Sequence, residues 1–143
     1  LVPNAPQGEA SERALVGAAR GGALVICDAV YAELGARFPS HADLATFLSD
    51  TSIRREPSSA ETLYEAATAW RRYQRNRPSS LQCPRCGNSE VVTCGRCGHP
   101  ILVRQHILTD LLIGAHALVQ AGKLLTRDRG YYVTYFPRLT LAS

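Results

Sequence analysis

Four of the five cysteines in this chain form two closely spaced pairs. Cys83 and Cys86 are followed by Cys94 and Cys97, and a glycine follows the second cysteine of each pair. Thiolates at this spacing can point at one metal, and four of them match the tetrahedral shell of structural Zn²⁺. The spacing predicts a zinc ribbon with four cysteine ligands and no open coordination position. A disulfide framework, a redox pair and an iron–sulfur cluster are the alternatives.

Two other residues could take part in cysteine or metal chemistry. His99 follows Cys97 closely and could replace a zinc ligand, although we expect it on the surface of the ribbon. Cys27 ends an apolar run and is expected to be a small buried side chain. Paired cysteines in a chain whose start lacks a basic segment before an apolar core are typical of a reducing compartment. We therefore expect a cytoplasmic protein.

Three carboxylates stand where a parallel sheet would gather them. Glu33 follows the apolar strand predicted over 23–27, Asp110 lies in the first turn of a helix predicted over 108–121, and Asp128 follows the next strand. Because the carboxyl ends of parallel strands and the amino ends of the following helices share one edge, we expect these acids to converge. Carboxylate oxygens prefer hard cations such as Mg²⁺ or Mn²⁺, which can activate water beside a phosphodiester.

Each carboxylate also has a purely structural interpretation. Asp110 could stabilise a helix amino end through the dipole, and Asp128 could be a turn residue between Arg127 and Arg129. Glu33 could be an ordinary ion-pair partner. Because Glu33 flanks an apolar stripe, we expect it to be half buried, where a cation or hydrogen-bond donors would offset its desolvation.

The elements that must position these residues alternate between helix and strand. Asp28 is expected to cap the second helix, and Ser58 with Glu61 forms a capping box for a long helix. In chain order we expect a helix ending at Gly21, a strand over 23–27, a helix over 28–37, a short helix around Leu44, a strand near Ile53, a helix from Ser58 to Pro78, a helix over 108–121 ended by Gly122, and strands over 123–126 and 139–141. The alternation predicts an α/β fold with a parallel sheet covered by helices on both faces.

Length and composition limit the class of protein. The chain has 143 residues, enough for one domain, and 45% hydrophobic residues exclude a disordered protein. No apolar run approaches the roughly 18 residues of a membrane span. A segment over 78–104, rich in Pro, Ser, Gly, Cys and Arg, is the expected ribbon, and it divides the domain into parts over 1–77 and 105–143.

Three segments resemble the PIN-domain ribonucleases of the VapC toxin type. They are Ile26–Leu34, Asp110–Leu118 and Leu124–Tyr132, and the ending Tyr135–Pro137 completes the resemblance. The resemblance implies a PIN-like parallel sheet and metal-dependent cleavage of RNA. It further implies a protein antitoxin as a partner and a homodimer.

The resemblance also assigns roles to particular residues. Glu33, Asp110 and Asp128 correspond to the catalytic acids that bind Mg²⁺ or Mn²⁺, and Thr126 corresponds to an auxiliary hydroxyl residue. Members of the family usually open with a strand that carries a further aspartate. Because the chain begins at Leu1 and contains no methionine, we expect that strand to lie in a preceding segment. The ribbon is an insertion that many members lack.

The distribution of charge along the chain indicates which kind of partner it could bind. The net charge is +4, and the stretch from Arg71 to Arg104 holds seven arginines and one acid, Glu90. This stretch could track RNA phosphates with little base specificity, or it could be a solvated helix end and ribbon, or a docking surface for an antitoxin. The candidate RNA-binding residues are Arg71, Arg75, Arg85, Arg96, Arg104 and Arg127. A non-catalytic RNA- or protein-binding module is the alternative function.

Overall fold

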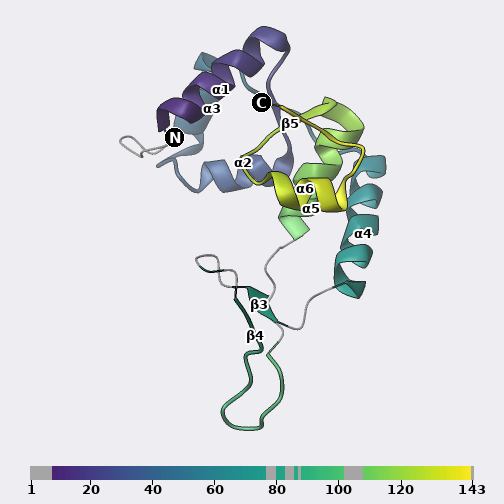
Figure 1. Cartoon of the computed structure of the whole chain (residues 1–143). Helices are drawn as coiled ribbons and strands as arrows, with labels where there is room; N and C mark the ends of the chain where they lie inside the picture. The colour runs from purple at the N-terminus through teal and green to yellow at the C-terminus, as the bar shows by residue number, and fades with distance from the viewer. Residues whose placement is uncertain (1–7, 77–79, 83–85, 87, 102–107, 143) are drawn as a thin grey trace.

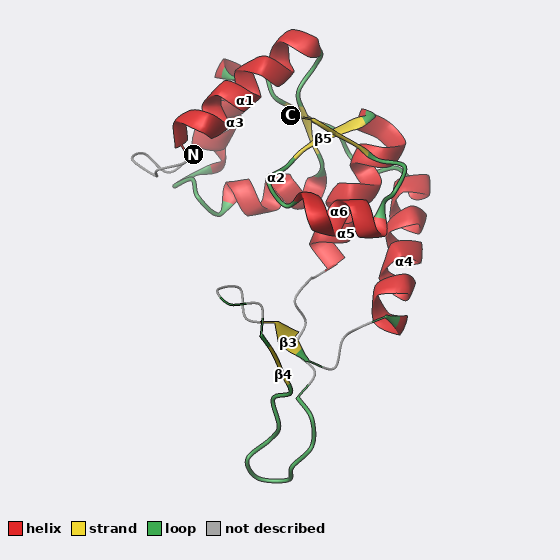
Figure 2. Ribbon diagram, in the orientation of Figure 1, coloured by secondary structure: helices red, strands yellow, loops and turns green. Residues whose placement is uncertain are grey.

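Helices and short strands alternate along the chain, and helices predominate (Figures 1 and 2). The computed structural model describes residues 8–76, 80–82, 86, 88–101 and 108–142. The elements are α1 (Gly8–Gly21), β1 (Val25–Ile26), α2 (Asp28–Gly35), α3 (His41–Asp50), β2 (Arg54–Arg55), α4 (Ala60–Arg75), β3 (Leu81–Gln82), β4 (Ser89–Glu90), α5 (Leu108–His116), the π-helical turn η1 (Ala117–Ala121), β5 (Lys123–Leu125), α6 (Arg129–Tyr135) and β6 (Thr140–Ala142). The expected mixed α/β class is confirmed.

The parallel strands form two separate pairs. Strand β1 runs parallel to β2, with Val25 opposite Arg54, and β5 runs parallel to β6, with Leu124 opposite Leu141. Within the described ranges no strand joins the two pairs, so the continuous PIN-like sheet that we expected is not present there. The strands are also shorter than predicted, because β1 extends only as far as β2 lies beside it.

The amino end of α2 differs from the prediction. Cys27 occupies the capping position, and Asp28 is the first residue of the helix. The Asp28 carboxylate instead accepts hydrogen bonds from the Arg55 Nε, at 2.9 Å, and from the Ser58 backbone N–H, at 3.1 Å. This side chain therefore ties α2 to the segment after β2, a long-range contact that local capping rules do not contain.

The amino end of α4 begins one residue later than predicted. Ser59, rather than Ser58, caps the helix, and its hydroxyl accepts a hydrogen bond from the Thr62 backbone N–H at 3.1 Å. Gln120 of η1 reinforces this end, since its side-chain oxygen accepts from the Ser59 backbone N–H at 2.9 Å and from the Thr62 hydroxyl at 2.7 Å. The Ser58 N–H is already used by Asp28.

The predicted helix over 108–121 changes its hydrogen-bonding pattern near its end. After α5 the Gly122 backbone N–H donates to the Ala117 carbonyl at 2.8 Å, five residues back, which closes a π-helical turn. Gly122 has a φ of 78°, in the left-handed region where glycine carries no Cβ penalty. The predicted stop at Gly122 is confirmed.

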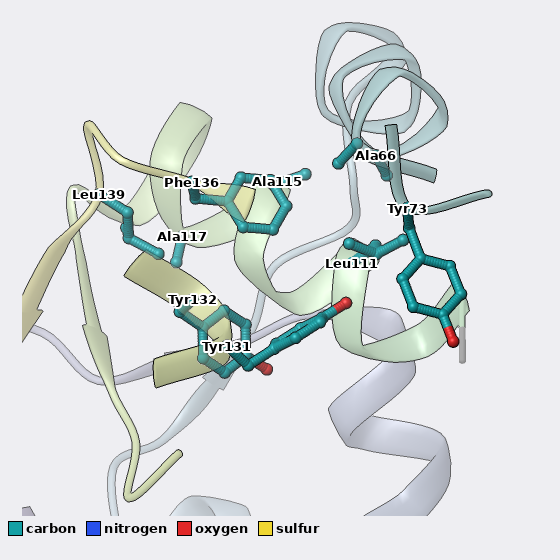
Figure 3. Packing of buried hydrophobic residues seen from close by; sticks show 10 residues of the cluster. Ala66, Tyr73, Leu111, Ala115, Ala117, Tyr131, Tyr132, Phe136 and Leu139 are labelled. Atoms are coloured by element: carbon teal, nitrogen blue, oxygen red, sulfur yellow. The ribbon is translucent and has the colours of Figure 1, made fainter. Parts of the chain in front are cut away.

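The core lies between α4, α5 and α6 (Figure 3). Leu111 and Ala115 on α5 are fully buried, and Tyr73 of α4 lies next to Leu111. Phe136 closes the other side so tightly that a Cβ added at Gly114 would lie 2.6 Å from its Cδ2 atom. Cys27 is 3% exposed, as predicted. In the described ranges, no helix is both long and apolar enough to cross a membrane.

Candidate functional site

The three predicted carboxylates all lie within electrostatic range of Tyr132 on α6. Tyr132 is 6% exposed, and burial raises the pKa of its hydroxyl. The charges of Asp110, Asp128, Cys27 and Glu33 raise this pKa further, in that order. Acids from α5, the start of α6 and α2 thus face the same region of the molecule.

Asp110 and Asp128 lie at the amino ends of two helices, α5 and α6. Asp110 is half buried in the first turn of α5, and its charge also contributes to the raised pKa of Tyr131. Asp128 is exposed and caps α6, where its Oδ1 atom accepts a hydrogen bond from the Tyr131 backbone N–H at 3.3 Å. Its structural role as a cap and a role as a ligand do not exclude each other, because one carboxylate oxygen has several acceptor positions.

Thr126 lies directly before this cap. Its hydroxyl oxygen accepts a hydrogen bond from the Asp128 backbone N–H at 3.2 Å. The contact fixes the short connection between β5 and α6. Thr126 therefore positions Asp128, and it is half buried at the carboxyl end of β5.

Glu33 differs from the prediction in its burial. We expected a half-buried carboxylate beside an apolar stripe, but Glu33 is exposed. The reason is that α2 has no buried residue, so neither of its faces offers a fully apolar environment. The desolvation argument for a cation at Glu33 is therefore wrong, although Glu33 still lies within electrostatic range of Tyr132.

The chemistry of these side chains suits a hard cation, but their arrangement is not that of a formed metal site. Carboxylate oxygens are the preferred ligands of Mg²⁺ and Mn²⁺. In the part of the chain that the structure describes, no three His, Cys, Asp or Glu side chains are grouped closely enough to hold a metal ion. The acids thus share a neighbourhood without forming a complete coordination shell.

The second cysteine pair forms a tight turn in the loop after β4, where a bridge between Thr93 and Pro100 closes the loop. Strands β3 and β4 project from the helical body (Figure 1). The backbone N–H groups of Arg96 and Cys97 donate to the Cys94 sulfur, which lowers the pKa of this thiol. Gly98 has a φ of 70°, and its N–H donates to the Cys94 carbonyl at 2.8 Å. The glycine after the second cysteine therefore does what the sequence predicts, because it lets the chain curl around the thiolates.

The remaining cysteines of the predicted ribbon are less informative. Cys86 is exposed, and Cys83 lies outside the described residues. His99 is exposed, as expected for a surface residue. Strands β3 and β4 pair in an antiparallel arrangement, with Gln82 opposite Ser89, so that Cys86 lies between them in the chain. A complete site with four cysteine ligands stays a prediction.

The candidate RNA-binding arginines lie on different elements. Those that the structure describes are all exposed: Arg71, Arg75, Arg96 and Arg127. Arg85 and Arg104 lie outside the described residues. On α4, the Arg71 Nη2 atom donates to the Thr68 hydroxyl at 3.0 Å, and the guanidinium lies 5.6 Å from the centre of the Tyr64 ring. This guanidinium is therefore held in one orientation on the outer face of the helix.

Sequence reasoning missed Tyr132, which belongs to an aromatic segment that we assigned to no element. Asp128 and Tyr132 are four residues apart, the spacing at which side chains meet on one helix face. That spacing, together with a capping aspartate, could have indicated both α6 and the tyrosine beside the acids. The Arg55 guanidinium was missed as well, and it lies 5.2 Å from the centre of the Tyr31 ring while bound to Asp28.

Known proteins give no further indication of function. Comparisons with protein-family models, with curated proteins and with solved structures find no match. Function must therefore be argued from the site. The resemblance of three segments to PIN-domain ribonucleases stays a prediction from the sequence.

Proposed function

We propose that this protein is a metal-dependent endoribonuclease that hydrolyses phosphodiester bonds of RNA. The observation that supports the proposal is that Glu33, Asp110 and Asp128, from three elements, all act electrostatically on Tyr132. Carboxylate oxygens are the preferred ligands of Mg²⁺ and Mn²⁺, so acids that face one region from three elements support a common cation. The alternating helices and parallel strand pairs are compatible with a PIN-like scaffold.

Each residue has a defined part in this proposal. Glu33, Asp110 and Asp128 hold Mg²⁺ or Mn²⁺, and Thr126 keeps Asp128 oriented through its backbone N–H. An ion held by these carboxylates would supply a water of lowered pKa and would stabilise charge on the leaving oxygen. Tyr132 keeps its proton across the working range, because burial and the surrounding carboxylates raise its pKa. Its hydroxyl can therefore donate a hydrogen bond to a carboxylate at any pH where the enzyme works.

The exposed arginines supply the contacts to RNA in this proposal. Arg71, Arg75, Arg96 and Arg127 would neutralise phosphates, and Arg85 and Arg104 belong to the same predicted set. Such contacts bind RNA in a salt-dependent manner and carry little base specificity. A toxin role, with a protein antitoxin that blocks the acids, a homodimer and a cytoplasmic location, is the biological setting that the resemblance suggests.

We further propose that Cys83, Cys86, Cys94 and Cys97 hold one structural Zn²⁺. The turn from Cys94 to Gly98 supports this, because backbone N–H groups donate to the Cys94 sulfur and lower the pKa of its thiol. Elemental analysis of the purified chain should find about one zinc per chain, and Cys94→Ser should lose it. Absence of zinc, with thiol titration showing disulfides, would contradict the assignment.

Cleavage assays on the whole chain test the nuclease proposal. RNA should be cut with Mg²⁺ or Mn²⁺, EDTA should stop the reaction, and Asp110→Asn should lower the rate by about 100-fold or more. Asp50→Asn at the end of α3 is the matched control, because Asp50 is an exposed carboxylate on another element. Equal rates for Asp110→Asn and the wild type would refute the proposal.

The second candidate function is a non-catalytic module that binds RNA or protein. It is favoured by the absence of a formed metal-binding group among the described residues. A module of this kind would retain RNA or partner affinity in Asp110→Asn and would show no cleavage that depends on Mg²⁺ or Mn²⁺. The same assays therefore separate the two functions.

A further inference from the structure

Helix α4 lies at the edge of the helical body and has one face turned away from the core (Figure 1). The buried residues of this helix recur every three or four positions: Thr62, Ala66, Ala69 and Tyr73. Successive residues of an α-helix are about 100° apart, so the residues two places further on lie about 200° away, on the opposite side. The residues on this outer face are Tyr64, Thr68, Arg71 and Arg75.

A short series of contacts joins three residues of the outer face. The Thr68 hydroxyl donates to the Tyr64 carbonyl at 3.1 Å and accepts from the Arg71 Nη2 atom at 3.0 Å. The guanidinium carbon of Arg71 lies over the Tyr64 ring, 5.6 Å from its centre. Helical side chains lean toward the amino end, which is why Arg71 reaches a residue two turns earlier. The cation is thus held on one face of an aromatic ring.

The ring itself is open to solvent. The Tyr64 side chain belongs to a residue that is 68% exposed, so the guanidinium leaves much of its π surface uncovered. An exposed aromatic ring costs hydration free energy and adds nothing to the core. The packing of α4 therefore gives no reason for an aromatic residue at this position.

The carboxyl-terminal part of α4 carries positive charge without nearby acids. Residues 66–75 contain Arg71, Arg72 and Arg75 and no Asp or Glu. Arg72 donates to the Tyr135 carbonyl at 3.1 Å. Among the residues that the structure describes, no carboxylate forms an ion pair with Arg71 or Arg75. Arg71 uses one of its five N–H donors on Thr68, so the others remain for an anionic ligand.

A second pair of tyrosine and arginine shows what a purely structural contact looks like here. The Arg55 guanidinium lies 5.2 Å from the centre of the Tyr31 ring, and its Nε atom is 2.9 Å from the Asp28 carboxylate. Tyr31 is half buried. In that pair the charge is compensated and the ring is partly covered, whereas the pair on α4 has neither property.

We propose that Tyr64 and Arg71 form a subsite for an unpaired nucleotide of RNA, in which the base stacks on the Tyr64 ring. Arg71 and Arg75 bind the flanking phosphates. Stacking requires a base whose faces are accessible, and the faces of a base inside a duplex are covered by its neighbours. The inference rests on the proposed action on RNA, and it adds a contact that distinguishes a single strand from a duplex at a distance from the carboxylates.

Fluorescence anisotropy with a labelled single-stranded RNA of about ten nucleotides tests the subsite. The whole chain carries Asp110→Asn, so that the RNA stays intact. Tyr64→Leu keeps an apolar side chain but removes the π surface, and it should weaken binding by about fivefold or more. Tyr64→Phe keeps the ring and should bind as tightly as the parent. Leu63→Ala is the matched control, because Leu63 is an exposed neighbour without a ring, and it should leave binding unchanged.

An oligomer with the same number of phosphates but no bases separates stacking from charge. Tyr64→Leu should bind this oligomer as the parent does, whereas Arg71→Gln should weaken the binding of both oligomers. Unchanged RNA binding by Tyr64→Leu, an equal loss in Leu63→Ala, or no RNA binding by the parent would overturn the proposal. Loss of a protein partner with unchanged RNA binding would assign the outer face of α4 to protein docking instead.

These measurements do not depend on cleavage. If the whole chain bound RNA in this way but cut none with Mg²⁺ or Mn²⁺, the proposed reaction would be refuted and the subsite would stand. If it cut RNA and Tyr64→Leu bound the single strand as the parent does, the subsite would be refuted and the reaction would stand.

Discussion

The hydroxyl oxygen of Thr126 accepts a hydrogen bond from the backbone N–H of Asp128 at 3.2 Å. Asp128 in turn caps α6 through the Tyr131 backbone N–H. Two hydrogen bonds between residues close in the sequence therefore orient the Asp128 carboxylate, which we propose as a metal ligand.

Removing the Thr126 hydroxyl should weaken catalysis without abolishing it. A single hydrogen bond contributes about 0.5–1.5 kcal/mol, so Thr126→Val should slow RNA cleavage by about two- to tenfold. Thr126→Ser keeps the hydroxyl and should restore the rate. Thr134→Val, which removes an exposed hydroxyl bonded to the Gly130 carbonyl on the same helix, is the control. Initial rates on a labelled RNA measure the effect, and equal rates for Val and Ser at position 126 would contradict it.

Neutralising the arginines of α4 should alter the salt dependence of RNA binding. Each lost phosphate contact to a single strand makes the slope of log K against log salt shallower by about 0.7, so Arg71→Gln with Arg75→Gln should change it by about 1.4. Binding is measured in the Asp110→Asn background, so that the RNA stays intact. Arg13→Gln on α1 removes an exposed charge elsewhere and should leave the slope unchanged. An unchanged slope in the double variant would assign these arginines to another role.

Asp28 should make the fold sensitive to acid. The Ser58 backbone N–H and the Arg55 guanidinium lower the pKa of its carboxyl below the ordinary value. A group with a lowered pKa in the folded state stabilises the fold above its unfolded pKa, which is about 3.9, and loses this contribution as the pH falls through the folded value.

Asp28→Asn should therefore reduce the loss of stability on acidification. Urea unfolding between about pH 6 and pH 3 measures this, because the variant should show a flatter dependence of the free energy of unfolding on pH. Asp50→Asn on α3 is the control for the loss of one exposed carboxylate. If the Asp28 variant follows the same steep curve as the wild type, the contacts to Ser58 and Arg55 contribute nothing to acid stability.

Gly114 should be intolerant of any side chain. A Cβ there would approach Phe136 Cδ2 to 2.6 Å, and Phe136 is 1% exposed, so the ring has little room to move. Gly114→Ala should lower the free energy of unfolding by about 1–3 kcal/mol, measured by urea titration. Gly17→Ala, where the added Cβ meets nothing within 4 Å, should instead raise it by up to about 1 kcal/mol. A stabilised Gly114→Ala would show that the core is looser than the contact implies.

Apart from β3, β4 and α6, the order of the elements could be predicted from the sequence because its signals are local. Gly122 ends a helix in a left-handed conformation, and Cys27 is buried at the end of an apolar run. The caps of α2 and α4, Cys27 and Ser59, were not predicted, because long-range contacts decide them. Asp28 and Ser58 have the right chemistry for caps, but Asp28 binds Arg55 and Ser58, which lie well beyond its own helix in the chain.

The positions of Asp110 and Asp128 at helix amino ends could be predicted from the sequence, and their role at a metal stays a prediction. Asp110 and Asp128 follow from the rule that helix amino ends and strand carboxyl ends meet at one edge. The exposure of Glu33 depends on which face of α2 is covered by other elements, and no local pattern contains that information. Tyr132 was overlooked because its aromatic segment was assigned to no element, whereas it lies within electrostatic range of the carboxylates.

The π-helical turn at Ala117–Ala121 determines the direction in which Gln120 points. A residue inserted into an α-helix rotates everything after it by about 100°, and the wider turn absorbs one such residue. If the same residues kept the regular α-helical pattern, the amide of Gln120 would turn away from Ser59 and Thr62. The first turn of α4 would then lose its two hydrogen bonds to Gln120. For this contact the number of residues in the π-helical turn therefore matters more than which apolar side chains it carries.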